Sequence, residues 1–165
     1  MRGVIAFVGI GVMSLAVVVT SASGINRPQT FSILSITEGF QQIGDFNFER
    51  PPRAGDRFTF TDGLYKWAGR KRGARVGHAE ILCTFTKSTQ AEPFSAFALC
   101  TGGFFLPAGQ VLIEGFIRFT DEPANFRIPV VGGTGAYANA RGYAHVRDIG
   151  PQDTDNSNIE FHLLP

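Results

Sequence analysis

The most constraining feature of the sequence is a series of short apolar runs separated by glycine, proline, asparagine and aspartate. Residues 24–165 show no sustained 3.6-residue periodicity, and short bounded runs of this kind are typical of β-strands. Glycine accounts for 20 of the 165 residues, and its density disfavours helices because glycine destabilises a helix interior. We therefore expect an all-β fold with at most one short helical segment.

The apolar runs predict eight strands, near residues 31–40, 56–62, 75–87, 94–101, 110–119, 126–131, 136–148 and 158–164. Eight short strands with turn residues between them are typical of a sandwich or a small antiparallel barrel. The chain is long enough for one such domain and too short for two ordinary ones. We therefore expect a single domain over residues 24–165.

The first 23 residues have a different pattern. Met1 and Arg2 precede an apolar run over residues 4–19, and small residues follow at 20–23. A positive start, an apolar stretch and a small-residue exit are typical of a secretory signal peptide. We expect cleavage near Ser23, a secreted protein and no stable membrane insertion afterwards. The alternative is an uncleaved membrane anchor, since the run is close to the lower length limit for spanning.

The charge balance excludes a global basic field. Lysine and arginine number 15 against 14 aspartate and glutamate, and removal of residues 1–23 leaves equal numbers of basic and acidic side chains. We therefore expect no nucleic-acid partner. Five basic residues and no acidic residue do gather in residues 66–75. This segment is expected to be a solvated hairpin loop, and docking to an anionic polymer or lipid headgroup is the alternative.

Two cysteines, Cys83 and Cys100, lie in apolar runs that are joined by a polar turn. The midpoint of the pair falls inside that turn, so an antiparallel hairpin would place the two sulfurs opposite each other on one face. Export favours oxidation, and we therefore predict a structural disulfide. Two buried thiols remain the alternative. A catalytic thiol is less favoured, because no histidine lies nearby on the same strand face.

Period-two alternation assigns faces to two carboxylates. In the first strand, Leu34, Ile36, Glu38 and Phe40 share one side, which sets Glu38 among apolar neighbours. We expect this face to point into the protein and the pKa of Glu38 to be raised by burial. An exposed position at the end of the strand is the alternative for Glu38.

In the second strand, Phe58, Phe60 and Asp62 share one side in the same way. Because Gly63 follows Asp62, a turn role is the alternative for this carboxylate. A glutamate and an aspartate that face one cavity could transfer a proton or stabilise a cationic intermediate.

The strand predicted at residues 110–119 is apolar on both faces. One face carries Val111, Ile113, Ile117 and Phe119, and the other carries Leu112 and Phe116 beside Glu114 and Arg118. Such a strand is expected to line a cavity on one side and to pack on a neighbour or a partner subunit on the other. We therefore expect a homo-oligomer, a dimer or a trimer.

The histidines do not indicate a metal site. His78 and Glu80 have the His-x-Glu spacing of zinc deaminases, but no Pro-Cys-x-x-Cys segment follows them. His145 and His162 lie far apart in the sequence. We therefore expect neither a metal nor a cofactor.

Three segments resemble known families. Residues 130–144, VVGGTGAYANARGYA, resemble the late-strand motif of dirigent proteins and of the related allene oxide cyclase barrel. Residues 54–85 are similar to the second and third strands of the cyclase pattern, and residues 106–115 to the strand that follows. The resemblance extends from about Phe31 to the C-terminus. It implies an eight-stranded antiparallel β-barrel, typically oligomeric and often trimeric, with a small cavity for one small hydrophobic ligand.

The same resemblance implies a set of site residues. Glu38 stands where cyclases have a glutamate and dirigent proteins an aspartate, and Asp62 matches an asparagine of the cyclases. Arg141 matches the arginine of the dirigent Ala-Arg-Gly segment, which belongs to the pocket of that family. Glu38, Asp62 and Arg141 are therefore the expected catalytic residues.

Other cyclase positions differ. Phe40 replaces an asparagine and Ile117 replaces a tyrosine, while Cys83 matches the cyclase cysteine but is expected to form a disulfide. The resemblance thus implies a related secreted barrel rather than an authentic allene oxide cyclase. Such a barrel would isomerise or cyclise a small hydrophobic molecule, or guide its stereochemistry. The alternative is a non-catalytic binding or structural barrel that docks through residues 66–75.

Overall fold

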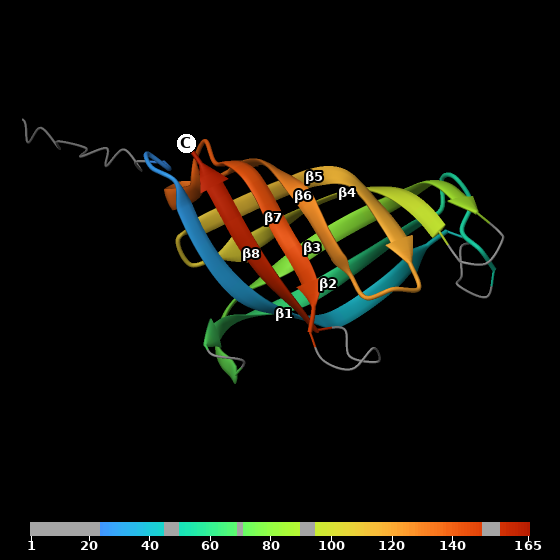
Figure 1. Cartoon of the computed structure of the whole chain (residues 1–165), viewed down its shortest axis with the longest axis horizontal. Helices are drawn as coiled ribbons and strands as arrows, with labels where there is room; N and C mark the ends of the chain where they lie inside the picture. Colours follow the sequence, from blue (N-terminus) through green and yellow to red (C-terminus); the bar gives the residue numbers. More distant parts are fainter. Residues whose placement is uncertain (1–23, 45–49, 69–70, 90–94, 150–155) are drawn as a thin grey trace, which may run out of the picture.

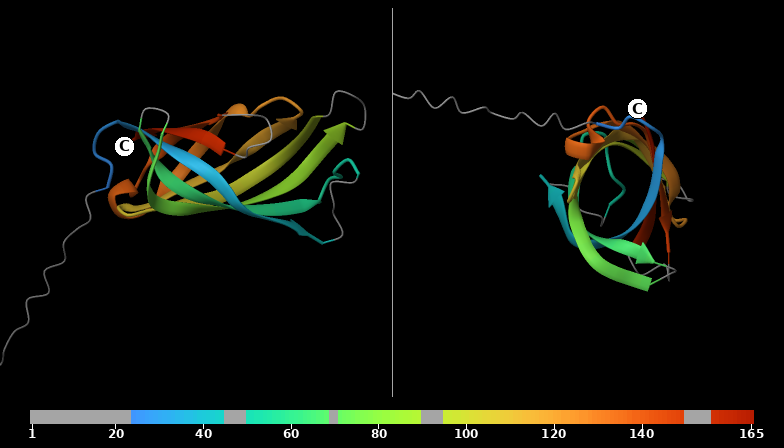
Figure 2. Two further views of the ribbon diagram at one scale, coloured as in Figure 1. Left: turned by 90° about the horizontal axis from the view of Figure 1, so that it is seen from below. Right: turned by 90° about the vertical axis from the view of Figure 1, so that its left-hand side faces the viewer.

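The structure, a computed structural model, describes residues 24–44, 50–68, 71–89, 95–149 and 156–165. The predicted signal peptide, residues 1–23, lies outside the described residues. Eight strands form one closed barrel, in which each strand pairs antiparallel with the next and β8 returns to pair with β1 (Figure 1, Figure 2). The strands are β1 (Gln29–Ile43), β2 (Arg57–Ala68), β3 (Lys71–Thr89), β4 (Ser95–Leu106), β5 (Gly109–Thr120), β6 (Asn125–Gly133), β7 (Arg141–Asp148) and β8 (Asn156–Leu164).

The predicted eight-stranded antiparallel barrel is confirmed, with one strand that starts later than expected. The strand predicted at residues 136–148 begins at Arg141, because a short 3-10 helix, η1 (Gly135–Tyr137), precedes it. Gly135 has a φ of 59° and Asn139 a φ of 65°. These left-handed backbone conformations are incompatible with a strand. The glycine-rich segment is therefore a corner between β6 and β7.

Aromatic side chains fill the barrel near η1. The Phe31 ring stacks on Phe161 with 4.9 Å between centroids, and Phe104 meets Phe161 edge-on at 5.0 Å. Tyr137 of η1 adds a further ring 5.9 Å from Phe31. Burial of such large apolar rings is the main favourable contribution to folding.

A second aromatic group packs further along the interior. Phe58 lies 5.3 Å from Phe85 and 5.7 Å from Phe119, and Phe85 lies 5.8 Å from Phe119. Phe58 and Phe85 are buried. The interior is thus packed by two aromatic groups that come from different strands.

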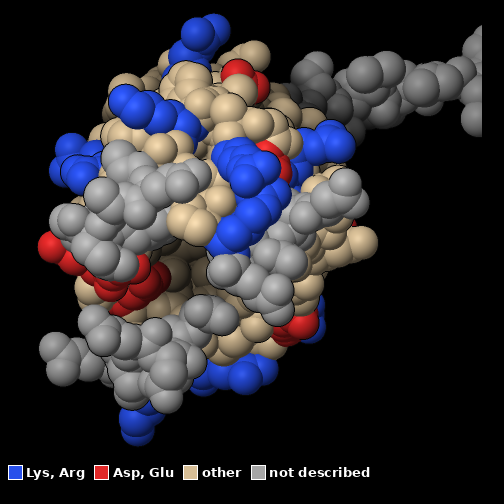
Figure 3. Space-filling model, turned by 90° about the vertical axis from the view of Figure 1, so that its right-hand side faces the viewer, with Lys and Arg blue, Asp and Glu red and all other residues tan. Residues whose placement is uncertain are grey.

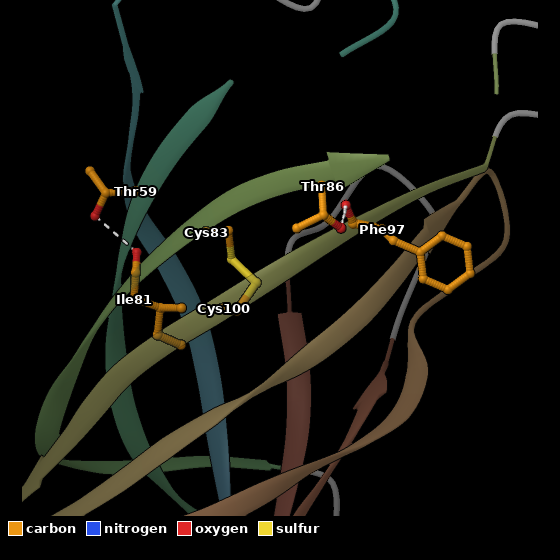
Figure 4. Close-up of a disulfide and its surroundings, with 6 residues drawn as sticks. All are labelled: Thr59, Ile81, Cys83, Thr86, Phe97 and Cys100. Atoms are coloured by element: carbon orange, nitrogen blue, oxygen red, sulfur yellow. Dashed lines mark hydrogen bonds between the residues drawn. A yellow bond between two sulfur atoms is a disulfide. The ribbon is translucent and has the colours of Figure 1, made fainter. Parts of the chain in front are cut away.

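The predicted disulfide is present. Cys83 of β3 and Cys100 of β4 lie directly opposite each other in the strand register, and both are fully buried (Figure 4). A hydrogen bond from the Thr59 hydroxyl to the carbonyl oxygen of Ile81 links the neighbouring strands β2 and β3. Because disulfides persist in oxidising compartments, this bond suggests a non-cytoplasmic environment. Within the described residues, no helix is both long and apolar enough to cross a membrane.

Replacement of both cysteines, in the double variant C83A/C100A, should lower the free energy of unfolding by roughly 3 kcal/mol, because the bond closes a loop in the unfolded chain. The sequence separation of the two cysteines is 17 residues. Urea unfolding of the variant and of the oxidised protein measures the difference. Peptide mapping of the purified protein without reductant should recover the two cysteines in one linked peptide. Recovery of both as free thiols would contradict the pairing.

Candidate functional site

The barrel interior contains a cavity of about 170 Å³. Most of its lining side chains are apolar and come from the seven strands β2 to β8: Phe60, Ile81, Phe104, Ile113, Ile117, Phe119, Phe126, Ile128, Val146 and Ile159. The remaining lining residues are small or polar: Thr37, Asp62, Ala124 and Ser157. The cavity contacts a member of each aromatic group, Phe104 and Phe119, so it lies in the space that the two groups leave between them. A concave apolar space with a few polar groups is typical of a small-molecule site.

Asp62 brings a carboxylate into this cavity. Its side chain is only 5% exposed, and it accepts hydrogen bonds from the hydroxyls of Ser35, at 2.6 Å, and Thr37, at 3.0 Å. Thr37 is the direct neighbour of Asp62 in the register of β1 and β2, and both residues therefore point inward. The predicted inward face of the second strand, with Phe58 and Phe60 beside Asp62, is thus present.

Ser35 and Thr37 were not among the expected site residues. They follow Phe31 and Ile33 on the inward face of β1, and Ser35 is 2% exposed. A signal for them exists in the sequence: two small hydroxyl residues two positions apart are well suited to hydrogen-bond a carboxylate on the neighbouring strand. The apolar residues Leu34 and Ile36 on the other face of β1 conceal this signal.

The expected position of Glu38 is wrong. The register of β1 and β2 shifts between Thr37 and Gly39, and Glu38 lies at this irregularity on the outer face of the barrel. A Cβ added at Gly63, which points outward between the inward Asp62 and Leu64, would overlap the Glu38 carboxylate. Glu38 therefore lies over the outer surface of β2 and does not line the cavity.

The expected rise in the pKa of Glu38 is also wrong. The Tyr65 hydroxyl donates to Oε1 at 3.0 Å and is the largest influence, and it lowers the pKa below the usual 4.5. Arg75 donates to Oε2 at 2.8 Å, and its positive charge and that of Arg72 lower the pKa further. Burial opposes these effects, but they outweigh it because the carboxylate has bonded and charged partners at the barrel surface.

Arg141 does not reach the cavity either. It is the first residue of β7, is exposed, and pairs in the register with Leu164 near the C-terminus. This position lies beside η1, where the aromatic rings fill the barrel. Of the three expected catalytic residues, the structure therefore places Asp62 in the cavity and Glu38 and Arg141 outside it.

The described residues of the basic segment, 66–68 and 71–75, belong to the hairpin formed by β2 and β3, which extends beyond the body of the barrel (Figure 1). Two of its arginines take part in contacts within the chain. The Arg72 guanidinium lies 3.8 Å from the centre of the Tyr65 ring, and Arg75 pairs with Glu38. These contacts make the segment part of an outer cluster around Tyr65, which is itself only 6% exposed.

The outer face of the barrel carries an apolar patch over β4, β5 and β6. Its members are large apolar side chains that are exposed in this single chain: Phe97, Leu112, Phe116 and Val131. Phe116 is 66% exposed. The inward residues of β5 line the cavity, so the prediction that this strand is apolar on both faces is confirmed.

The chemistry that this site can supply follows from one carboxylate in an apolar space. A carboxylate held by two hydroxyls can accept or return a proton, or it can stabilise positive charge that develops on a bound molecule. In the described part of the chain, no group of three or more histidine, cysteine, aspartate or glutamate side chains is arranged to hold a metal ion.

Fold and cavity together define a closed antiparallel barrel with an internal apolar site. The family model of the allene oxide cyclase barrel like domain matches residues 40–161, and the chain therefore belongs to this family. The resemblance to cyclase and dirigent barrels predicted from the sequence is thus confirmed. No match is found among curated protein sequences.

Solved structures with the same fold include a pyocyanin demethylase, at 26% sequence identity and a TM-score of 0.63, which covers 82% of this chain and 100% of its own. The exo-specific intermolecular Diels-Alderase AbnU is 17% identical, with a TM-score of 0.58 and coverage of 82% and 97%. A pterocarpan synthase dirigent protein is 20% identical, with a TM-score of 0.57 and coverage of 84% and 94%. Similar barrels thus act on small molecules in different reactions.

The outer contacts of Glu38 predict a pH effect. Because its pKa is lowered on folding, Glu38 stabilises the protein above the unfolded pKa of 4.5, and this contribution is lost as the pH falls through the lower folded value. The difference in stability between the protein and E38Q should therefore be largest near neutral pH and shrink in acid. NMR titration of the Glu38 carboxyl should give a pKa below 4.5, and R75A should raise it. A value above 4.5 in the unaltered protein would contradict the outer position.

Proposed function

We propose that this protein is a secreted barrel that binds a small hydrophobic molecule in its cavity. There it isomerises or cyclises that molecule, or holds it so that its reaction follows one stereochemical course. The observation that carries the proposal is the apolar cavity with Asp62 in its wall. A leucine or phenylalanine side chain at this position would fill the same space without the cost of burying a carboxylate. The presence of a buried carboxylate here therefore favours a functional role.

Asp62 is the proposed catalytic residue. In an isomerisation, the carboxylate removes a proton from one carbon of the bound molecule and returns it to another, so that no further reactant is needed. In a cyclisation, its negative charge lowers the energy of a positively charged transition state. Ser35 and Thr37 keep both carboxylate oxygens in position for either role. Confinement of the molecule in a narrow space adds to the rate by fixing its conformation.

Relatives support a reaction of this kind in general terms. The solved structures of the same fold include proteins named a demethylase, a Diels-Alderase and a pterocarpan synthase dirigent protein. A further cyclase with this fold is described as catalysing a [4 + 2] cycloaddition. Secretion is supported by the buried disulfide and by the sequence pattern of residues 1–23.

Native mass spectrometry of the protein purified from its own source should detect one retained small molecule per chain. The variant I117F, which adds a ring inside the cavity, should lose this molecule, because Ile117 is one of the lining residues. The matched control is T30F, since Thr30 is exposed on β1, away from the cavity and from the outer patch over β4, β5 and β6, and this variant should keep the molecule. Retention by I117F, or a cavity that takes up no apolar probe such as toluene, would overturn the proposal.

We also propose that the outer patch over β4, β5 and β6 joins copies of this chain into a dimer or trimer. Exposed apolar patches usually mark interaction surfaces, and the equal numbers of acidic and basic residues expected after residue 23 give little charge repulsion between copies. A closed symmetric assembly would cover Phe116 in every copy.

Sedimentation at micromolar concentration should therefore show an oligomer, and F116D should shift it to a monomer because a charge would be buried at the contact. The control is T30D, which adds the same charge at an exposed position on β1 and should leave the oligomer intact. A monomer in the unaltered protein would exclude the assembly.

A further inference from the structure

The described residues that line the cavity include one acidic side chain. Among the described residues that line it, Asp62 is the only one with an ionisable side chain, and none is basic. The side chain is nearly fully buried, and the Ser35 and Thr37 hydroxyls donate to its two oxygens. The carboxylate therefore has a fixed position and direction within an apolar space, where an attraction between opposite charges is stronger than in water.

The walls of the cavity also favour a cation. Phe60, Phe104, Phe119 and Phe126 contribute four aromatic rings to the lining. The face of an aromatic ring carries partial negative charge and attracts cations that lie over it. A flat aromatic ligand can in addition stack on these rings, so that the same walls serve its apolar part.

Acidic residues also lie beside the lining of the cavity. Ala124 and Ser157, both lining residues, are held by Asp148: its carboxylate accepts from the Ala124 backbone at 2.7 Å and from the Ser157 hydroxyl at 2.8 Å. Asp121 and Glu122, both exposed, precede Ala124 in the turn between β5 and β6. The cavity is thus bordered by acidic residues where it meets this turn.

Figure 3 looks onto the barrel end where β5 ends and β6 begins, and shows a hollow with acidic side chains gathered along one side of it. Basic side chains lie across the hollow (Figure 3). One arginine near β2, Arg50, pairs with Asp56 at 2.7 Å, which offsets its charge. A positively charged ligand would be attracted to the acidic side of this hollow.

The cavity also limits the size of the ligand. Its volume of about 170 Å³ is close to that of an engineered apolar cavity of about 150 Å³ that holds one benzene molecule. One six-membered ring with a small substituent therefore fits the space that the described residues enclose.

From these observations we propose that the cavity selects a small aromatic cation, with its charge beside Asp62 and its ring between the phenylalanines. The inference rests on the proposed function and narrows its ligand class: the bound molecule is mostly apolar but carries a positive charge. Asp62 then distinguishes this ligand from a neutral ring of the same shape.

Three probes of nearly the same shape and different charge test this: N-methylpyridinium, toluene and benzoate. Calorimetry on the unaltered protein should give a dissociation constant for N-methylpyridinium at least about tenfold lower than that for toluene, which corresponds to about 1.4 kcal/mol. Benzoate should bind more weakly than both, because its carboxylate would lie beside that of Asp62.

The variant D62N should lose the preference for the cation and keep the affinity for toluene. Its matched control is E80Q, which removes the same charge from an exposed position on β3, outside the cavity and the outer patch, and should keep the preference. Circular dichroism verifies that D62N is folded, and the three-probe comparison on the unaltered protein decides the proposal even if this variant is not.

The outcomes separate the two proposals. Binding of toluene without a preference for N-methylpyridinium overturns the cation inference and leaves the proposed function standing. Binding of none of the three probes contradicts both. A preference that persists in folded D62N assigns the selectivity to a group other than Asp62, and the inference as stated is then wrong.

Discussion

Pairing of β8 with β1 is the contact on which the rest of the structure depends, because it turns an open sheet into a barrel. The register runs from Gln29 opposite Leu163 to Ile36 opposite Asn156. Closure removes the exposed strand edges, and it also fixes which side chains share the interior, since every strand must alternate between inside and outside. A cavity then exists only where the inward side chains fail to fill the enclosed volume. In this barrel that place adjoins Asp62.

Much of the fold could be predicted because several strands carry unambiguous patterns. The order of the strands follows from the apolar runs, and the position of the turn between Cys83 and Cys100 was sufficient to pair them. In β2 the two inward phenylalanines mark the face to which Asp62 also belongs. Where a strand has one clearly apolar face, alternation alone predicts the direction of its polar residues.

The part of the site that could not be predicted lies on β1. Both faces of this strand are apolar, with Ile33 on the inner face and Leu34 on the outer, and both side chains are buried. Alternation therefore gives no choice between them, and the shift of register after Thr37 follows from pairing with β2 rather than from any local pattern. The position of Glu38 depends on the pairing of β1 with β2. A resemblance between aligned residues does not predict that pairing.

Glu38 and Asp62 were predicted to face one cavity, but the register shift between Thr37 and Gly39 places them on opposite sides of the barrel wall. Glu38 lies outside, where Tyr65 and Arg75 hold its charge in a cluster that covers the outer surface of β2. Asp62 lies inside, where its hydrogen bonds come from hydroxyls and its surroundings are aromatic. The outer carboxylate contributes to the fold through its partners. The inner one adds a desolvation cost to folding, and a bound molecule of opposite charge would offset that cost.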